Sequence, residues 1–140
     1  MNDCIFCKII AGQISAEKVF ENDSVVAFLD IKPINGGHVL VVPTTHAARY
    51  EELSAEIATH LAEAVHWLAP QIMGALGADG YNLGLNNGAA AGQIIDHVHW
   101  HIIPRYNNDG LTHWPNKMAT SEELHVIAEK IRSTAQTKKV

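Results

Sequence analysis

Histidine alternates with large apolar residues over His97–Ile102, and this alternation constrains the fold of the chain more than any other feature. Successive side chains of a β-strand point to opposite faces, so the pattern predicts a strand over His97–Ile103 with its apolar face against the core. The opposite face would carry three imidazoles, His97, His99 and His101. Imidazole titrates near neutral pH, so it suits a chemical role better than a merely solvated face. A solvated strand face that happens to carry histidines is the alternative.

Composition indicates one ordinary globular domain. The chain has 140 residues, of which 47% are apolar and 18% charged, and this length is enough to bury a core. The net charge of −5 argues against a nucleic acid partner, because such a surface needs clustered Lys and Arg. No apolar run approaches the roughly 20 residues of a membrane span, and the N-terminus lacks the layout of a signal peptide. We therefore expect a cytoplasmic protein with no membrane partner.

Turn residues and side-chain periodicity divide the chain into short strands and a long helix. The expected strands cover 17–21, 24–29, 38–42, 81–85 and 97–103. The turn pair Asn22-Asp23 should join the first two strands as a hairpin. A helix is predicted over Ser54–Leu76, because apolar residues recur there every three or four positions. Ser54 is its expected N-cap, Gly77 follows its end, and Pro70 should kink or break it.

A second helix is predicted near the C-terminus of the chain. Thr120 and Glu123 form a capping box, and Leu124, Ile127 and Ile131 lie on one face of the helix that follows. Strands and two helices in this order predict an α+β fold with a mainly antiparallel sheet.

The stretch from Asn86 to Arg105 resembles the signature of the histidine triad (HIT) family of nucleotide-processing enzymes. The resemblance extends from Ile5 to about Pro115, which is most of the chain. It implies a HIT-like α+β fold with a five-stranded, mainly antiparallel sheet and two main helices. It also implies a single HIT domain over 1–140, with a core at 4–118 and a C-terminal helix at about 120–135. Family members usually pair their sheets across a homodimer, so a homodimer is expected.

The resemblance assigns the chemistry to the three histidines of the triad. A neutral, well-oriented imidazole is a suitable nucleophile toward phosphorus. In the family pattern the middle histidine, here His99, attacks the α-phosphorus of a nucleotide and forms a nucleotidyl-histidine intermediate that is later hydrolysed. His101 would bond phosphate oxygens and offset the charge of the transition state. His97 completes the catalytic triad.

Hydrolysis of a P–N bond in an adenosine-5′-phosphoramidate, with an AMP-like product, is the activity that this resemblance favours. The substrate would then be a purine nucleotide. Hydrolysis of dinucleoside polyphosphates is an alternative within the same chemistry. A non-catalytic, zinc-supported nucleotide-binding or interaction protein is an alternative from another class. It predicts binding without turnover, and the intact triad argues against it.

The resemblance also implies a nucleotide-binding set on several segments. It comprises Asp30 for the ribose hydroxyls, Ile5, Phe6, Ile9, Phe28 and Ile31 for the base, and Asn86, Gly92, Gln93 and the Ile94 backbone for the nucleotide and its phosphate. By spacing alone, the apolar members could equally be core residues, and a Gly/Ala loop between strands often means only a turn. Family members commonly carry Ser or Thr where this chain has Ile94, so one hydroxyl donor is missing here.

Cys4 and Cys7 are the two cysteines of the chain, and in the cytoplasm they would stay reduced. Two thiolates three residues apart can bind one tetrahedral metal, but a closed zinc site needs two further ligands. A redox pair and two free thiols are the alternatives. The resemblance implies that His46 and His97 complete the site. The expected cofactor is therefore one structural zinc per chain, held by Cys4, Cys7, His46 and His97.

The remaining histidines and one further motif received no catalytic role. His38, His60, His66, His113 and His125, together with Trp67, are expected to be surface or packing residues. The stretch Thr112–Pro115 resembles a C-terminal segment that reaches the partner's site in the phosphoramidase branch of the family. A further helix follows it in this chain, so this role is left open.

Overall fold

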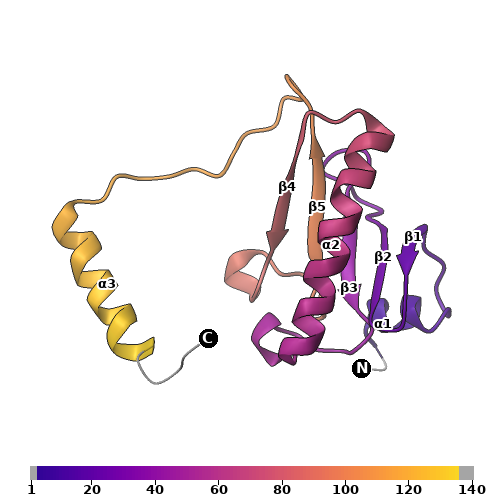
Figure 1. Cartoon of the computed structure of the whole chain (residues 1–140), viewed down its shortest axis with the longest axis horizontal. Coiled ribbons are helices and arrows are strands. Elements are labelled where there is room, and N and C mark those ends of the chain that lie inside the picture. The colour runs from indigo at the N-terminus through magenta and orange to yellow at the C-terminus, as the bar shows by residue number, and fades with distance from the viewer. Residues whose placement is uncertain (1–2, 136–140) are drawn as a thin grey trace. The chain divides into compact units, whose positions relative to one another are not determined.

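Five antiparallel strands form the sheet of this protein, which we describe over residues 3–135 from a computed structural model (Figure 1). The strands are β1 (Lys18–Glu21), β2 (Val25–Leu29), β3 (Val39–Pro43), β4 (Gly80–Leu85) and β5 (Trp100–Arg105). They lie in the order β1-β2-β3-β5-β4, and each neighbouring pair is antiparallel. The predicted α+β class, the antiparallel sheet and the β1–β2 hairpin are confirmed.

Each face of the sheet packs against a different helix. Val25 and Ala27 of β2 pack with residues of α2 (Ala55–Leu76), which crosses one face of the sheet (Figure 1). Val26 and Phe28 pack on the opposite face with residues of the short helix α1 (Ile5–Ile10), which the sequence analysis did not predict. Alternation along β2 therefore supplies two apolar clusters, one on each side of the sheet.

The long helix α2 begins and ends where the sequence predicts. The Ser54 hydroxyl accepts a hydrogen bond from the Ile57 backbone N–H at 3.2 Å, which caps the N-terminus. Gly77 has φ +62°, in the left-handed region that favours glycine at a helix end. The helix continues through Pro70, so the expected break does not occur there.

The strand predicted over His97–Ile103 begins three residues later and ends two residues later. β5 begins at Trp100 and includes Pro104, so the chain from His97 to His99 leads into the strand without belonging to it. The prediction was wrong at this boundary because β3 pairs with β5 only through Trp100, His101 and Ile102. The carbonyl of Pro104 accepts a hydrogen bond from the Asn35 side chain rather than from β3. An N–H at this position would point to the same side, so its absence removes no hydrogen bond between strands.

The described residues divide into two units, 3–109 and 110–135. The first unit holds the sheet, α1, α2 and the two 3-10 turns η1 (Tyr50–Glu52) and η2 (Ala89–Ala91). The second unit holds α3 (Ser121–Ala135), which the sequence predicts. Its capping box is confirmed, because Thr120 and Glu123 exchange side chain to backbone hydrogen bonds of 2.8 and 3.2 Å. Among the described helices, none has the length and apolar character to cross a membrane.

Candidate functional site

The three histidines of the triad lie on the α1 side of the sheet. The Phe6 ring of α1 meets the rings of His97 and His99 edge-on, with centroids 5.9 and 5.2 Å apart. The apolar residues that alternate with them, Val98 and Ile102, are buried in the cluster on the α2 side, and Trp100 packs against that cluster. The predicted alternation therefore holds, although the strand begins only at Trp100. The histidine face is not solvated, because His97 is fully buried and His99 is 7% exposed.

His99 is held in one tautomer by the backbone. Its Nδ1 lies 2.6 Å from the carbonyl oxygen of His97, and a carbonyl only accepts, so Nδ1 carries the proton. Nε2 of His99 therefore keeps its lone pair. Burial lowers the pKa of His99, which favours the neutral ring. The result is a neutral imidazole with a free nitrogen, the form that attacks an electrophile.

His101 is held in the opposite tautomer by His38. The Ile34 backbone N–H donates to Nδ1 of His38 at 3.1 Å, so in the neutral His38 ring Nε2 carries the proton. That Nε2 lies 2.9 Å from Nδ1 of His101 and donates to it. Nε2 of the neutral His101 ring is then an N–H donor. Burial, aided by His99 and His38, lowers the pKa of His101 to about 4, so the ring is neutral near pH 7.

The Nε2–H of His101 is buried and has no hydrogen-bond partner among the described residues. A buried donor without a partner is costly and calls for an explanation. The His101 ring lies 4.9 Å from the ring of His99, measured between centroids. An acceptor bound beside Nε2 of His99 would therefore satisfy this donor. Phosphoryl oxygens are acceptors of this kind.

His38 is the residue of this site that the sequence analysis missed. It was expected to be a surface or packing residue, but it is 2% exposed and hydrogen-bonded to the triad. The sequence does contain a signal for its position. His38 lies two and four residues before Leu40 and Val42, so along an extended chain all three side chains point to the α1 side. Leu40 pairs with His101 across β3 and β5, and that pairing brings His38 near the triad. The pairing of two distant strands cannot be read from one local pattern.

The acidic residue expected at the ribose lies beside His38. An oxygen of the Asp30 carboxylate is 3.8 Å from Nε2 of His38, which is beyond hydrogen-bond length but close enough to attract a positive charge. The other oxygen accepts the backbone N–H of Lys32 at 2.9 Å. Asp30, His38 and His101 also cluster closely enough to suggest a metal site. Nε2 of His38 and Nδ1 of His101 point at each other at hydrogen-bond distance. We therefore interpret the cluster as a chain of hydrogen bonds that fixes His101, which we call the relay, rather than as a metal site.

The apolar residues expected at the base separate into two groups. Phe6, Ile9 and Phe28 are each 6% exposed or less and form the cluster beneath the histidines. Ile5 and Ile31 are 39% and 87% exposed and can contact a ligand directly. Phe6, Ile9 and Phe28 are therefore core residues, which is the alternative role that their spacing in the sequence allows.

The small-residue loop over 86–94 is fixed by the side chain of Gln93. Its Oε1 accepts the Gly88 N–H at 2.7 Å, and its Nε2 donates to the carbonyls of Ala48 and Ile95 at 2.6 and 3.0 Å. The Gln93 side chain is thus already occupied and holds the loop in place. Gly92 has φ +91° and approaches the Asn86 side chain. Ile94 is 89% exposed, so the loop presents an apolar side chain to solvent there.

Four potential metal ligands meet at the edge of the triad. Sγ of Cys7 lies 3.3 and 3.6 Å from Nδ1 of His46 and His97, and Sγ of Cys4 lies 3.5 Å from Nδ1 of His97. The two Nδ1 atoms are 3.2 Å apart. Ligands of one tetrahedral zinc should be separated by about 3.6 Å for sulfur and nitrogen and about 3.3 Å for two nitrogens. The donor set therefore fits zinc.

The surroundings of this Cys/His cluster also favour a cation. Nε2 of His97 donates to the carbonyl of Pro43 at 2.9 Å, which leaves Nδ1 free to bind a metal. Burial and the neighbouring Cys4 thiol raise the pKa of Cys7, so two thiolates would not coexist here without a positive charge. A metal ion supplies that charge.

Known proteins resemble this chain in sequence and structure. The HIT domain family matches residues 11–108. The adenosine 5′-monophosphoramidase of Schizosaccharomyces pombe is 42% identical over 132 residues, which cover 93% of this chain and 96% of that protein. A HIT family protein from Bacillus subtilis has a similar crystal structure, with TM-score 0.87, 41% identity and coverage of 94% and 96%. A zinc-bound histidine triad family protein from Mycobacterium smegmatis matches with TM-score 0.76, 29% identity and coverage of 98% and 99%.

Proposed function

Because this chain belongs to the HIT domain family, we propose that it hydrolyses or transfers nucleotidyl groups at the α-phosphorus through a nucleotidyl intermediate on His99. The observation that carries this proposal is the pairing of opposite tautomers. Nε2 of His99 has a free lone pair, while Nε2–H of the neighbouring His101 is a buried donor without a partner. A nucleophile and an electrophilic donor directed at one bound group are what displacement at phosphorus needs.

The first step forms a bond between phosphorus and His99. Nε2 of His99 attacks the α-phosphorus, the bond to the leaving group breaks, and a leaving amine takes a proton from solvent. The phosphoryl oxygen accepts the hydrogen bond of His101 Nε2–H as negative charge builds on it. The ring of His99 becomes cationic, and its short Nδ1–H bond to the His97 carbonyl stabilises that charge.

The second step restores the enzyme. Water attacks phosphorus, the bond to Nε2 breaks, and its electron pair returns to His99. The protons of the water pass to solvent, and a nucleoside monophosphate is released. We propose an adenosine-5′-phosphoramidase as the most fitting activity, since a relative with this name is 42% identical over nearly the whole chain. The product would be AMP or a similar purine nucleotide.

The nucleotide would bind along the open side of the histidine face. We assign the ribose hydroxyls to Asp30 and the base to the exposed side chains of Ile5 and Ile31. The phosphate would contact the loop at Gly92 and the Ile94 backbone N–H, since a glycine loop allows an anion to approach the backbone closely.

A zinc ion would be held by Cys4, Cys7, His46 and His97, and when bound it would supply structural rigidity with no open coordination position. The His97 ring would be a ligand while its carbonyl orients His99, so the metal cluster and the nucleophile share one residue. Reduced thiols of this kind suit the cytoplasm, which is the compartment we propose.

We propose a homodimer joined through β4, and a single HIT domain over 1–140 with its core at 4–118. Both β1 and β4 are at edges of the sheet, but the register of β1 shifts between Lys18 and Phe20, which hinders further pairing. β4 pairs regularly over six residues and exposes Tyr81 and Leu83. Light scattering of the purified protein would test the dimer, and a monomer at micromolar concentration would contradict it.

The decisive experiment compares leaving groups. Purified protein is mixed with an adenosine phosphoramidate or with diadenosine polyphosphates, and turnover is measured together with a covalent adenylyl-protein by mass spectrometry. Faster turnover of the phosphoramidate supports our assignment, and faster turnover of the polyphosphates supports the alternative hydrolase. Nucleotide binding without turnover of either would reject the enzyme and support a binding protein.

A further inference from the structure

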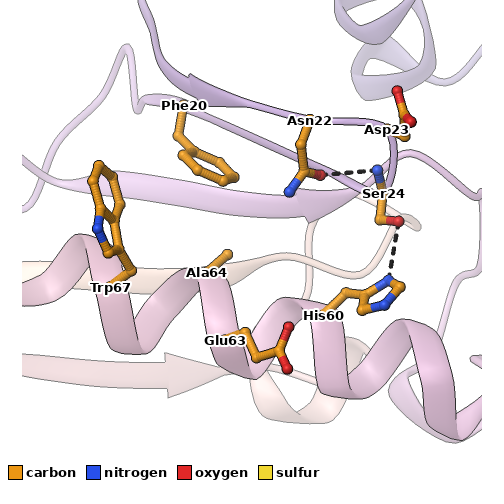
Figure 2. A pocket seen from close by; sticks show the side chains of 8 residues that line it. All are labelled: Phe20, Asn22, Asp23, Ser24, His60, Glu63, Ala64 and Trp67. Atoms are coloured by element: carbon orange, nitrogen blue, oxygen red, sulfur yellow. Dashed lines mark hydrogen bonds between the residues drawn. The ribbon is translucent and has the colours of Figure 1, made fainter.

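A pocket lies on the opposite side of the sheet from the histidines. It has a volume of about 510 Å³ and is formed by the β1–β2 hairpin and α2 (Figure 2). Ala64 at its base belongs to the apolar cluster on the α2 side, whereas Phe6, which contacts His99, belongs to the cluster on the α1 side. Pockets of this size commonly bind small molecules. The proposed nucleotide chemistry does not use it.

The aromatic end of this pocket exposes a large π surface. Trp67 and Phe20 lie side by side, with ring centroids 5.7 Å apart and planes tilted by 44° (Figure 2). Trp67 is nevertheless 54% exposed, so much of its indole faces solvent. A tryptophan face attracts cations through its quadrupole and offers apolar area to an aliphatic chain.

A carboxylate lies one helical turn from this indole. Glu63 and Trp67 are four residues apart on α2, so their side chains are neighbours on one face of the helix. Glu63 is exposed, and no other described residue forms a hydrogen bond or ion pair with it. Neither α2 nor the pocket lining contains Lys or Arg. A cation that enters the pocket therefore meets no repulsion from a fixed positive side chain there.

The opposite end of the pocket is held rigid by hydrogen bonds. The Ser24 hydroxyl lies 3.0 Å from Nδ1 of His60, and Oδ1 of Asn22 accepts the Ser24 N–H at 2.9 Å (Figure 2). The same Oδ1 also accepts the Val25 N–H at 2.8 Å. These contacts join the hairpin turn to α2. The spacing between hairpin and helix is therefore set before a ligand binds.

We propose that this pocket binds a small guanidinium compound with an aliphatic stem. The planar guanidinium would stack on Trp67 and donate a forked pair of hydrogen bonds to Glu63, while the stem covers Ala64. A guanidinium fits better than an ammonium because it is flat and less strongly hydrated. The proposal is independent of the triad, which lies across the sheet.

Titration with n-butylguanidinium, followed by NMR through the backbone N–H signals of the residues that line the pocket, tests the proposal; the indole N–H of Trp67 is a further probe wherever that residue is present. We expect saturable shifts, with Glu63→Gln and Trp67→Leu each weakening binding by about fivefold or more. Glu56→Gln is the matched control, because Glu56 lies on the same helix outside the pocket lining. Trp67→Leu changes a packing contact, so Glu63→Gln, which keeps the shape of the side chain, decides the result.

Three outcomes would overturn the proposal. Equal shifts with neutral n-butylurea would show that charge is irrelevant, and unchanged affinity in Glu63→Gln would remove the carboxylate from the site. Tighter binding of a blocked Arg tripeptide than of n-butylguanidinium would reassign the pocket to peptides. The His99→Ala variant should bind n-butylguanidinium as the wild type does, so failure of the proposed catalysis would leave this result unchanged.

Discussion

His97 and His99 are two residues apart, yet the backbone fixes their rings in opposite tautomers. His97 donates from Nε2 to the Pro43 carbonyl and turns Nδ1 toward two thiols and His46. His99 donates from Nδ1 to the His97 carbonyl and leaves Nε2 free. The backbone acceptor that each ring faces therefore decides which of its nitrogens is free and what that ring can do. One carbonyl leaves Nδ1 of His97 free for a metal, and the next leaves Nε2 of His99 free for attack on an electrophile.

The largest test of this comparison is His99→Ala. If His99 is the nucleophile, kcat should fall by about four orders of magnitude or more, because the nitrogen that forms the covalent intermediate is removed. Binding of nucleoside monophosphate and thermal stability should change little. Turnover and calorimetry together measure these effects.

His66→Ala is the matched control for the nucleophile, because His66 is exposed on α2. It should leave kcat unchanged. Near wild-type turnover in His99→Ala would show that another residue is the nucleophile. The proposed division of roles between His97 and His99 would then be wrong.

Removal of the metal should affect stability rather than the chemical step. A ligand present at a thousand times its dissociation constant stabilises the folded state by about 4 kcal/mol. We therefore expect Cys7→Ser, or chelation of the wild-type protein, to lower the melting temperature by more than about 10 °C. Elemental analysis should find one zinc per chain in untreated protein. A metal-free protein of unchanged stability would show that the Cys/His cluster is a set of free side chains.

The Cys/His cluster and the relay from His38 to His101 also differ in how well the sequence predicts them. The short spacing of Cys4 and Cys7 and the alternation after His97 are local patterns, whereas the family resemblance implies His46 and His97 as further ligands. The structure brings these four residues together. The relay from Ile34 through His38 to His101 depends on pairing between β3 and β5, which are far apart in the sequence. Alternation of side chains predicts which face of the sheet a residue lies on more reliably than it predicts where a strand begins, since β5 begins only at Trp100.

His38 therefore provides a test of the relay. His38→Leu removes the donor that fixes the tautomer of His101, and we expect kcat to fall by about 10- to 100-fold. His38→Gln keeps an N–H donor and should recover part of the loss. The positive charge that His38 can carry helps to lower the pKa of His101, so in His38→Leu the His101 ring, followed by NMR, should titrate at higher pH. Equal losses in both variants without that shift would indicate a packing role.

Burial of the neutral His101 ring predicts that the free energy of unfolding decreases as the pH is lowered. Its pKa is lowered from 6.5 to about 4 in the folded protein. Between these values the unfolded chain binds a proton that the folded chain does not, so stability is lost as pH falls from about 6.5 toward 4. One such group contributes a slope of at most about 1.4 kcal/mol per pH unit, reduced by solvent screening. Urea unfolding across this range should show a smaller slope in His101→Asn, and equal slopes would contradict a buried neutral ring.

The smallest expected effect concerns Ile94, the exposed apolar residue beside the proposed phosphate loop. A departing amine needs a proton, and Ile94 offers only its backbone N–H where family members commonly carry a hydroxyl. A hydrogen bond to a charged group contributes about 1.5–3 kcal/mol, and exposure favours the lower end. Ile94→Ser should therefore accelerate nucleotidylation roughly tenfold for the most basic amines and little for good leaving groups.

The control for this prediction is Ile94→Ala, which removes the isoleucine without adding a donor. Pre-steady-state measurements across amines of different basicity separate the two effects. If both variants accelerate all substrates equally, Ile94 acts by obstructing the loop. If neither changes the rate, solvent already protonates the leaving amine, and the donor of His101 alone is enough for the charge on phosphorus. A gain confined to basic amines in Ile94→Ser would show that the site has a nucleophile and an oxyanion donor but lacks its own proton source.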